Sequence, residues 1–163
     1  MKDRVIPVLN LSDFTRAEKD KRREFVRELG NAFRRVGFVG IANHGVDKKL
    51  VDDFYAASRR FFALPDEVKR KYEIAGLAGQ RGYTSFGKEH AKHSEVADLK
   101  EFFQIGQETP PQDADASDYP PNVKVEEVPE LWELGNRLFR SFEEAGKHLL
   151  RAIALFLELE ESY

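Results

Sequence analysis

The chain has 163 residues, of which 41% are hydrophobic and 34% carry a charge, a composition that predicts one soluble globular domain. Its formal net charge of −3 argues against nucleic acid or an anionic membrane as a partner, since both attract basic proteins. It contains no cysteine, which excludes disulfides and thiolate metal sites, and we expect a cytoplasmic location.

The first part of the chain predicts a strand and then a helix. Residues 5–11 are mostly apolar, and Pro7, which lacks an N–H group, is expected at a sheet edge or at the beginning of a strand. Thr15 and Glu18 have the spacing of a capping box, which predicts a helix from there to about Val36. The apolar stripe of this helix recurs at helical spacing and includes Phe25, Leu29 and Phe33.

The segment 35–46 combines a helix end, a strand and a turn. Gly37 follows two arginines, which is typical of a helix C-terminus. Residues 38–42 predict a buried strand with a central glycine that lets another chain segment approach closely. The Asn-His-Gly sequence at 43–45 is typical of a turn. His44 has two interpretations at this point, a catalytic base or a turn residue whose ring binds backbone groups.

The middle of the chain predicts two helices, a loop and a strand. One helix begins near Asp47, and the next, shorter one begins at Pro65 and runs through Tyr72. Four glycines within residues 74–87 indicate an irregular loop. Residues 99–105 predict a half-buried strand. The next stretch, 107–122, is rich in Pro, Asp and Ala and is expected to be an internal loop.

The strongest periodic pattern begins at Pro129. Apolar residues recur every three or four positions, so we predict a helix that continues to Ser162 and reaches roughly 45 Å at 1.5 Å per residue. The apolar run inside it is too short to span a bilayer and is broken by Arg151. In total the patterns predict about four helices and three short strands, an α+β fold.

Five stretches of the sequence together carry a family resemblance. They are the Ile-Pro-Val-Leu-Asn-Leu opening at 6–11, the segment 37–46, Phe-Phe-Ala-Leu-Pro at 61–65, Arg-Gly-Tyr at 81–83 and Leu-Leu-Arg at 149–151. These stretches resemble the N-terminal region of the isopenicillin N synthase-like oxygenases. The resemblance implies a mainly helical N-terminal module whose few short strands would join the jelly-roll sheet of a full-length oxygenase. Residues 1–163 are then expected to form a single domain, with the catalytic jelly-roll domain absent.

The resemblance also implies a function. The family uses non-haem Fe(II) and mostly 2-oxoglutarate, and a full-length member would hydroxylate or desaturate a small molecule. For this chain it implies a structural and pocket-lining role, with no catalytic residue and no cofactor of its own. His44 is implied to be structural and distant from iron.

Two residues of the 81–83 stretch are candidates for the substrate pocket. In relatives the corresponding loop folds over the mouth of the barrel, so the resemblance implies that Arg81 and Tyr83 line the pocket. Arg81 offers a planar fork for a carboxylate, and Tyr83 offers a ring with a polar tip. The alternative is that Arg81 pairs with a surface acid and Tyr83 packs beneath the loop.

The family holds iron with a His-x-Asp or His-x-Glu pair and a distal histidine. This chain contains one formal match, made of His93, Glu95 and His148. The first two lie in a charged polar stretch, the third lies inside the long predicted helix, and no Arg-x-Ser follows it. We therefore expect no iron site from these residues. His90 with His93 lacks a clear third ligand for zinc and is expected to be a surface pair.

Three hypotheses follow. The preferred one is an N-terminal module whose partner is the missing jelly-roll domain, with a small-molecule substrate in the full-length enzyme. The second is an autonomous interaction module that binds a partner or self-associates through the apolar face left exposed. The third is a compact metalloenzyme that uses the formal histidine and glutamate match.

Overall fold

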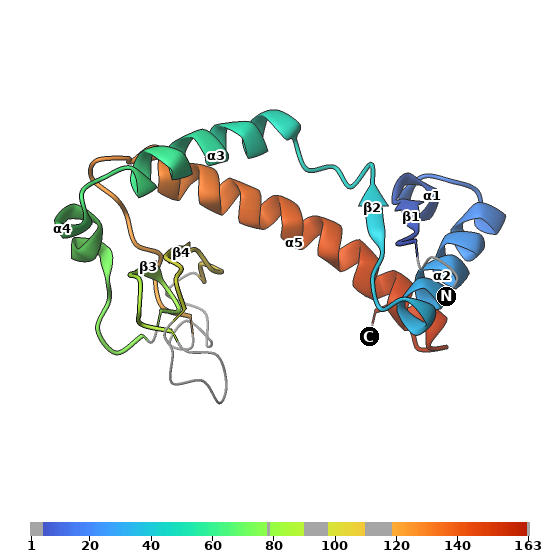
Figure 1. The fold of residues 1–163 in the computed structure, drawn as a ribbon. Helices are drawn as coiled ribbons and strands as arrows, with labels where there is room; N and C mark the ends of the chain where they lie inside the picture. Colours follow the sequence, from blue (N-terminus) through green and yellow to red (C-terminus); the bar gives the residue numbers. More distant parts are fainter. Residues whose placement is uncertain (1–4, 78, 90–97, 110–118, 163) are drawn as a thin grey trace. The chain divides into compact units, whose positions relative to one another are not determined.

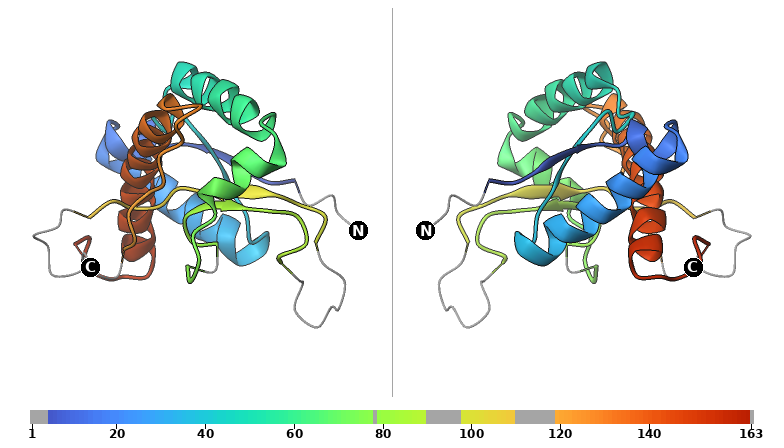
Figure 2. Two further views of the ribbon diagram at one scale, coloured as in Figure 1. Left: turned by 90° about the vertical axis from the view of Figure 1, so that its left-hand side faces the viewer. Right: turned by 90° about the vertical axis from the view of Figure 1, so that its right-hand side faces the viewer.

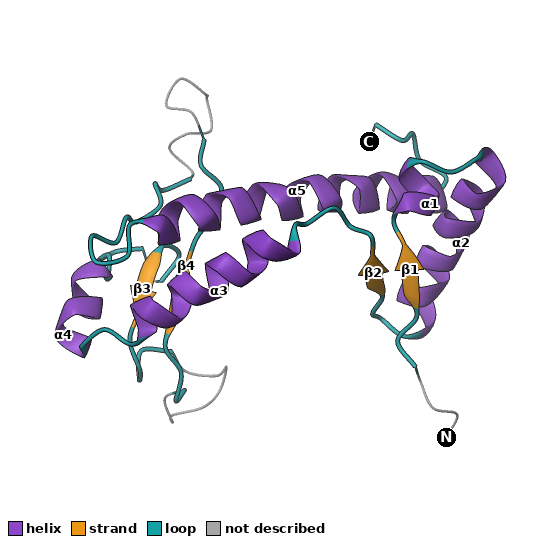
Figure 3. Cartoon of the chain, turned by 90° about the horizontal axis from the view of Figure 1, so that it is seen from above, coloured by secondary structure: helices purple, strands orange, loops and turns teal. Residues whose placement is uncertain are grey.

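The computed structural model describes residues 5–77, 79–89, 98–109 and 119–162. The chain divides into two compact units, one formed by 1–47 with 141–163 and the other by 48–140. Figure 1 gives the elements in chain order, and Figure 3 separates helices from strands. Each unit contains one buried hydrophobic cluster and one two-stranded sheet within the described residues, and each is described by itself.

The sheet of the first unit is a parallel pair of three-residue strands. β1 (Val8–Asn10) pairs with β2 (Gly40–Ala42), and Val8 is the register partner of Gly40. Both predicted strands are confirmed, although each is shorter than its apolar run. The predicted burial of the second strand is wrong, because β2 is only partly buried and Phe38 before it is exposed. A Cβ atom at Gly40 would lie 3.1 Å from Cγ2 of Val8, so the central glycine does permit a close approach. Pro7 stands just before β1, and its carbonyl accepts a hydrogen bond from the Gly40 N–H at 2.8 Å.

The predicted capping box is wrong. Residues 12–15 form a separate single-turn helix, α1 (Ser12–Thr15), and the long helix α2 (Lys19–Arg35) begins four residues later than expected. The Thr15 hydroxyl donates back to the Leu11 carbonyl at 3.2 Å instead of capping the next helix. The end of α2 is as predicted, because Gly37 has a φ of +84° and its N–H donates to the Phe33 carbonyl.

The last helix, α5 (Glu130–Phe156), is predicted correctly at its beginning but ends earlier than expected. Its 27 residues span about 40 Å. Glu158 adopts a φ of +61°, and the Leu159 N–H returns to the Ala154 carbonyl at 2.9 Å, which closes the helix. In the first unit α5 packs on α2, where a Cβ at Gly30 would overlap the ring of Phe156. The core of this unit contains Leu11, Phe14, Phe25, Leu29, Ala145 and Ala152.

The second unit is built around Phe61, whose side chain is fully buried. Phe61 lies near the end of α3 (Lys48–Phe62), and four rings surround it at centroid distances of 4.9–6.2 Å: Phe62, Tyr72, Tyr83 and Phe103. The predicted short helix consists of α4 (Asp66–Lys69) followed by a 3₁₀ turn, η1 (Arg70–Tyr72), with Pro65 directly before it. The aromatic cluster therefore joins α3, η1 and the sheet of this unit.

The prediction of a wholly irregular loop over 74–87 is wrong in one place. β3 (Gly82–Thr84) lies inside it and pairs antiparallel with β4 (Phe102–Gln104), which confirms the strand expected within 99–105. The two strands lie along each other in both views of Figure 2, where β3 is green and β4 yellow. The four glycines of the loop, Gly82 included, all have φ between +73° and +84°, which explains why the pattern of the sequence indicates a loop.

The α+β fold class is confirmed. The described residues contain five α-helices, one 3₁₀ turn and four strands. The elements that the sequence patterns miss are the short helix α1 and the strand β3. Among these residues no helix is both long enough and apolar enough to cross a membrane.

Candidate functional site

The pocket candidates Arg81 and Tyr83 both lie at the β3–β4 pair, and the structure gives them different surroundings. Tyr83 is only 3% exposed, and its ring meets the edge of Phe61 at a centroid distance of 5.7 Å. Its hydroxyl donates to Oε2 of Glu101 at 2.5 Å. The polar tip of Tyr83 is thus bound to a side chain of the same unit.

The Glu101 carboxylate collects a second buried donor. Lys69, at the end of α4, is 4% exposed, and its Nζ donates to the same Oε2 at 2.7 Å. Asp66 lies one turn earlier on α4 and reaches this ammonium group at 3.0 Å. Burial acts to lower the pKa of Lys69, but the hydrogen bonds to Glu101 and Asp66 outweigh it and raise that pKa above its usual range. The ammonium group therefore stays charged inside the unit.

The same contacts make the Tyr83 hydroxyl a weaker acid than that of an unperturbed tyrosine. Burial, followed by the hydrogen bond to Glu101, raises the pKa of Tyr83 from 10.0 to about 12. The pKa of Tyr83 is higher in the folded state than in the unfolded state. The stability that its protonated hydroxyl contributes is therefore complete below pH 10 and is lost as the pH rises through 12. We expect an alkaline absorbance titration to show one tyrosinate that is absent in Tyr83→Phe and forms at about pH 12. A midpoint near pH 10 for this group would contradict the buried bond.

Arg81 precedes β3 and lies across the end of the strand pair. Its Nη1 donates to the Gln80 carbonyl at 2.7 Å, and its Nη2 donates to the Gln107 carbonyl at 3.3 Å. The guanidinium occupies the place that a side chain at Gly106 would need. Its Nε is buried and has no hydrogen-bond partner among the described residues. Within the same part of the chain no carboxylate forms an ion pair with it, so the surface-acid alternative finds no support there.

A cavity of about 330 Å³ lies beside β3, and both Tyr83 and Thr84 contribute to its lining. On the same wall the Glu73 carboxylate accepts the Ser85 N–H at 3.1 Å and pairs with Lys88 at 2.5 Å. Burial acts to raise the pKa of Glu73, but the bonds to Lys88 and Ser85 outweigh it and lower that pKa. The carboxylate is therefore ionised and holds the chain that follows β3.

Asn122 fixes the chain after β4. Its side-chain amide accepts the Gly106 N–H and donates to the Gly106 carbonyl, both at 2.8 Å, and also donates to Oδ1 of Asn136 at 3.0 Å. The amide thus makes the pair of bonds that a neighbouring strand would make. Sequence reasoning missed Asn122, because it stands in a polar loop with no periodic pattern.

His44 occupies the turn after β2 and has the contact that the structural interpretation predicts. Its Nδ1 accepts the Val46 N–H at 3.1 Å. The residue before it, Asn43, has a φ of +52°, and its amide donates to the Asn10 side chain at 3.0 Å. The ring therefore holds a turn that the left-handed Asn43 begins.

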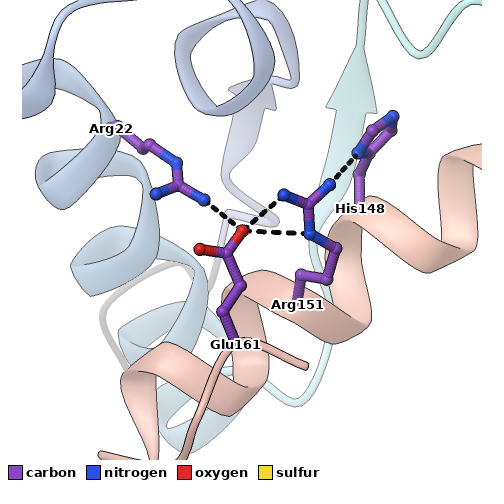
Figure 4. Close-up of polar contacts among 4 residues, drawn as sticks. All are labelled: Arg22, His148, Arg151 and Glu161. Carbon is purple, nitrogen blue, oxygen red and sulfur yellow. Dashed lines mark hydrogen bonds and ion pairs between the residues drawn. The ribbon is translucent and has the colours of Figure 1, made fainter. Parts of the chain in front are cut away.

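Of the formal iron match, His93 and Glu95 lie outside the described residues, as does His90. His148 lies on α5 as predicted, with its Nδ1 3.4 Å from Nη1 of Arg151. Figure 4 shows this contact beside the Glu161 carboxylate, whose Oε1 accepts from Arg22 and Arg151 at 2.5 Å each. The hydrogen bonds from these two arginines lower the pKa of Glu161, and the bond from Arg22 has the larger effect. In the ranges that the structure covers, no three His, Asp or Glu side chains gather as metal ligands would.

Residues 6–131 match a protein family described as "non-haem dioxygenase in morphine synthesis N-terminal". A 2-oxoglutarate-Fe(II) type oxidoreductase of Metarhizium majus is 28% identical over 99% of this chain and 51% of its own. A 2-oxoglutarate-dependent dioxygenase of Aspergillus flavus is 38% identical over 52% of this chain and 23% of its own. A solved 2OG-Fe(II) oxygenase family protein of Caulobacter crescentus superposes with a TM-score of 0.82 at 32% identity, covering 96% of this chain and 50% of that one. This chain spans about half the length, or less, of these relatives.

Proposed function

Since this chain belongs to the family of non-haem dioxygenase N-terminal domains, we propose that it serves an Fe(II)- and 2-oxoglutarate-dependent oxygenase acting on a small molecule. The reaction would be a hydroxylation or a desaturation, and the cytoplasm would be its compartment. The observation that carries the proposal is the match of nearly the whole chain to one half of a solved oxygenase. The chain would be the structural and pocket-lining part of that enzyme, folded as a single N-terminal domain.

The described residues do not suit Fe(II). They bring together no three metal-ligating side chains, and the one described member of the formal match, His148, has the Arg151 guanidinium beside its ring nitrogen. A cation at that distance opposes the binding of a metal ion. We therefore assign iron and 2-oxoglutarate to the half of an oxygenase that this chain does not span, and we derive no chemical step through either group.

We propose that this chain contributes the positively charged side chain of Arg81 to the substrate pocket. Arg81 presents a planar guanidinium that two backbone carbonyls orient, and it forms no ion pair among the described residues. Such a fork suits a carboxylate, which can accept two parallel N–H bonds from it. The Tyr83 ring would contribute as a wall of the cavity beside β3, with its hydroxyl held by Glu101.

The sheet of the first unit favours the proposal that a jelly-roll domain is the partner of this chain. A two-stranded sheet is marginal by itself, and β1 and β2 have no further strand beside them in the described residues. Large apolar side chains near these strands are exposed, namely Val5, Ile6, Val8 and Phe38. We propose that the strands of a jelly roll complete this sheet and cover these residues.

A chimera tests the proposal. The N-terminal half of the Caulobacter protein is replaced by this chain, and Fe(II) with 2-oxoglutarate is titrated while the visible charge-transfer band is followed. We expect a stoichiometric band in the chimera, none in this chain alone, and a weaker band or none in the isolated C-terminal half. A stoichiometric band in this chain alone would show that it holds iron and would overturn the proposal.

The exposed apolar residues near β1 and β2 also favour a second candidate function, an interaction module without catalysis. It predicts a stable dimer or a stable complex of this chain in the absence of any oxygenase half. Sequencing the gene downstream of Tyr163 separates the two candidates, because only the first requires a region coding for a jelly roll there.

A further inference from the structure

The β3–β4 pair cannot be held by its own backbone. Each strand has three residues, and a two-stranded sheet of that length is unstable in water without side-chain support. Gly82 opens β3 in a left-handed conformation, and Gly79 and Gly87 on either side are left-handed as well. Glycine-rich backbone loses more entropy on ordering than other backbone. Apart from one further backbone bridge, between Glu73 and Gly82, the support must therefore come from side chains.

One carboxylate oxygen joins three elements at this pair. Oε2 of Glu101, the residue before β4, accepts from Lys69 of α4 at 2.7 Å and from Tyr83 of β3 at 2.5 Å. We call these three residues the Glu101 cluster. Lys69 and Tyr83 are 4% and 3% exposed, and the Glu101 side chain is 17% exposed. The Lys69 Nζ also lies 5.6 Å from the centre of the Tyr83 ring.

The chemistry of the Glu101 cluster favours a positioning role over a stabilising one. Buried ion pairs lose much of their attraction to desolvation, and apolar side chains of the same size often give equal stability. A charged cluster instead fixes the positions of its members. An ammonium or carboxylate that moves away from its partner stays buried without a hydrogen bond, which is unfavourable. Lys69 and Glu101 thus penalise any displacement of β3 and β4 from α4.

Arg81 lies at the end of the β3–β4 pair, directly before β3. Its guanidinium lies over Gly106 and donates to the carbonyls of Gln80, which comes shortly before β3, and Gln107, which comes shortly after β4. The buried Nε finds no acceptor among the described residues. The bond to Gln107 crosses from the β3 side to the β4 side, so the direction of the guanidinium depends on how β3 and β4 pair.

We propose that Lys69, Glu101 and Tyr83 are positioning residues that hold the β3–β4 pair so that Arg81 is oriented toward an anionic group of the ligand. Lys69 and Glu101 touch no ligand themselves and act through the strands. Tyr83 acts in the same way through its hydroxyl, while its ring lines the cavity beside β3. The inference rests on the proposed function in one respect, that the β3–β4 pair borders a ligand pocket. The solvent exchange of the buried Arg81 Nε–H, which reports whether the side chain keeps its place, can be measured in this chain without iron or substrate.

The test follows the Arg81 Nε–H by nitrogen–proton correlation spectroscopy of the isotopically labelled chain, with the signal assigned by its loss in R81K. Because this N–H is buried, it should exchange slowly with solvent. We expect Y83F and K69M to speed its exchange at least tenfold. E101Q, which preserves the shape of the side chain, serves as the second variant should K69M fail to fold.

Tyr72 supplies the matched control. It also packs on Phe61, is also buried, and also donates to a carboxylate at 2.5 Å, but that carboxylate belongs to Glu127. Y72F should leave the Arg81 exchange rate within twofold of the original protein. The proposal is overturned if Y83F and E101Q fold and leave that rate unchanged, or if Y72F speeds it as much as Y83F does. Neither outcome bears on iron binding by the chimera, so the two proposals fail separately.

Discussion

Replacing Phe61 with alanine is expected to lower the free energy of unfolding by about 3–5 kcal/mol. The side chain is fully buried and meets four aromatic rings, so its removal leaves a cavity that rigid rings cannot fill. The chain has a single tryptophan, Trp132, which lies in the same unit, so its fluorescence during urea unfolding reports on this core.

Phe86→Ala is the matched control for this prediction. Phe86 belongs to the same unit but is 53% exposed, so its truncation should change the free energy of unfolding by no more than about 0.5 kcal/mol. Equal losses in the two variants would mean that the aromatic cluster around Phe61 is not the core of the unit.

Gly82→Ala is expected to lower the free energy of unfolding by about 2–5 kcal/mol, a large effect for one methyl group. Gly82 has a φ of +73°, which a Cβ atom disfavours by about 1–2 kcal/mol. In addition, the new Cβ would overlap the carbonyl oxygen of Tyr72 and approach Val123 at 2.9 Å. Backbone cannot yield as a flexible side chain can, so relief requires that β3 shift.

Gly76→Ala separates the two causes. Gly76 has a φ of +84°, but a Cβ there would meet nothing within 4 Å. It should show only the conformational cost of about 1–2 kcal/mol. Urea unfolding of both variants, followed through Trp132, should give Gly82→Ala a clearly lower midpoint concentration of urea than Gly76→Ala. Equal midpoints would contradict the close approach of the Tyr72 carbonyl.

Long periodic elements could be predicted from the sequence, and short ones could not. The stripes of α2, α3 and α5 repeat over several turns, so their existence follows from local pattern alone. β3 spans three residues, one of them Gly82, and a period of two cannot be recognised over that length. Its pairing depends on β4, twenty residues further along the chain. Tertiary contacts, and not local preference, make it a strand.

The candidate site was predictable in part for a similar reason. Arg81 and Tyr83 were found through the family resemblance of their short motif, and the structure places both at the same pair of strands. Lys69 and Glu101 were missed because each lies among other charged residues and reads as part of a solvated face. Their contact spans 32 positions, and no spacing rule connects residues so far apart.

The Asn122 clamp has a consequence for how this scaffold tolerates change. Because the Asn122 side chain fastens the chain at Gly106, we expect the fold to depend little on the number of residues between these two points. Doubling the length of such a connection costs only about 0.6 kcal/mol in closure entropy. We therefore expect the strands to tolerate a change in the length of this connection, provided that the contacts of Gln107 with Arg81 and of Glu108 with Trp132 are kept.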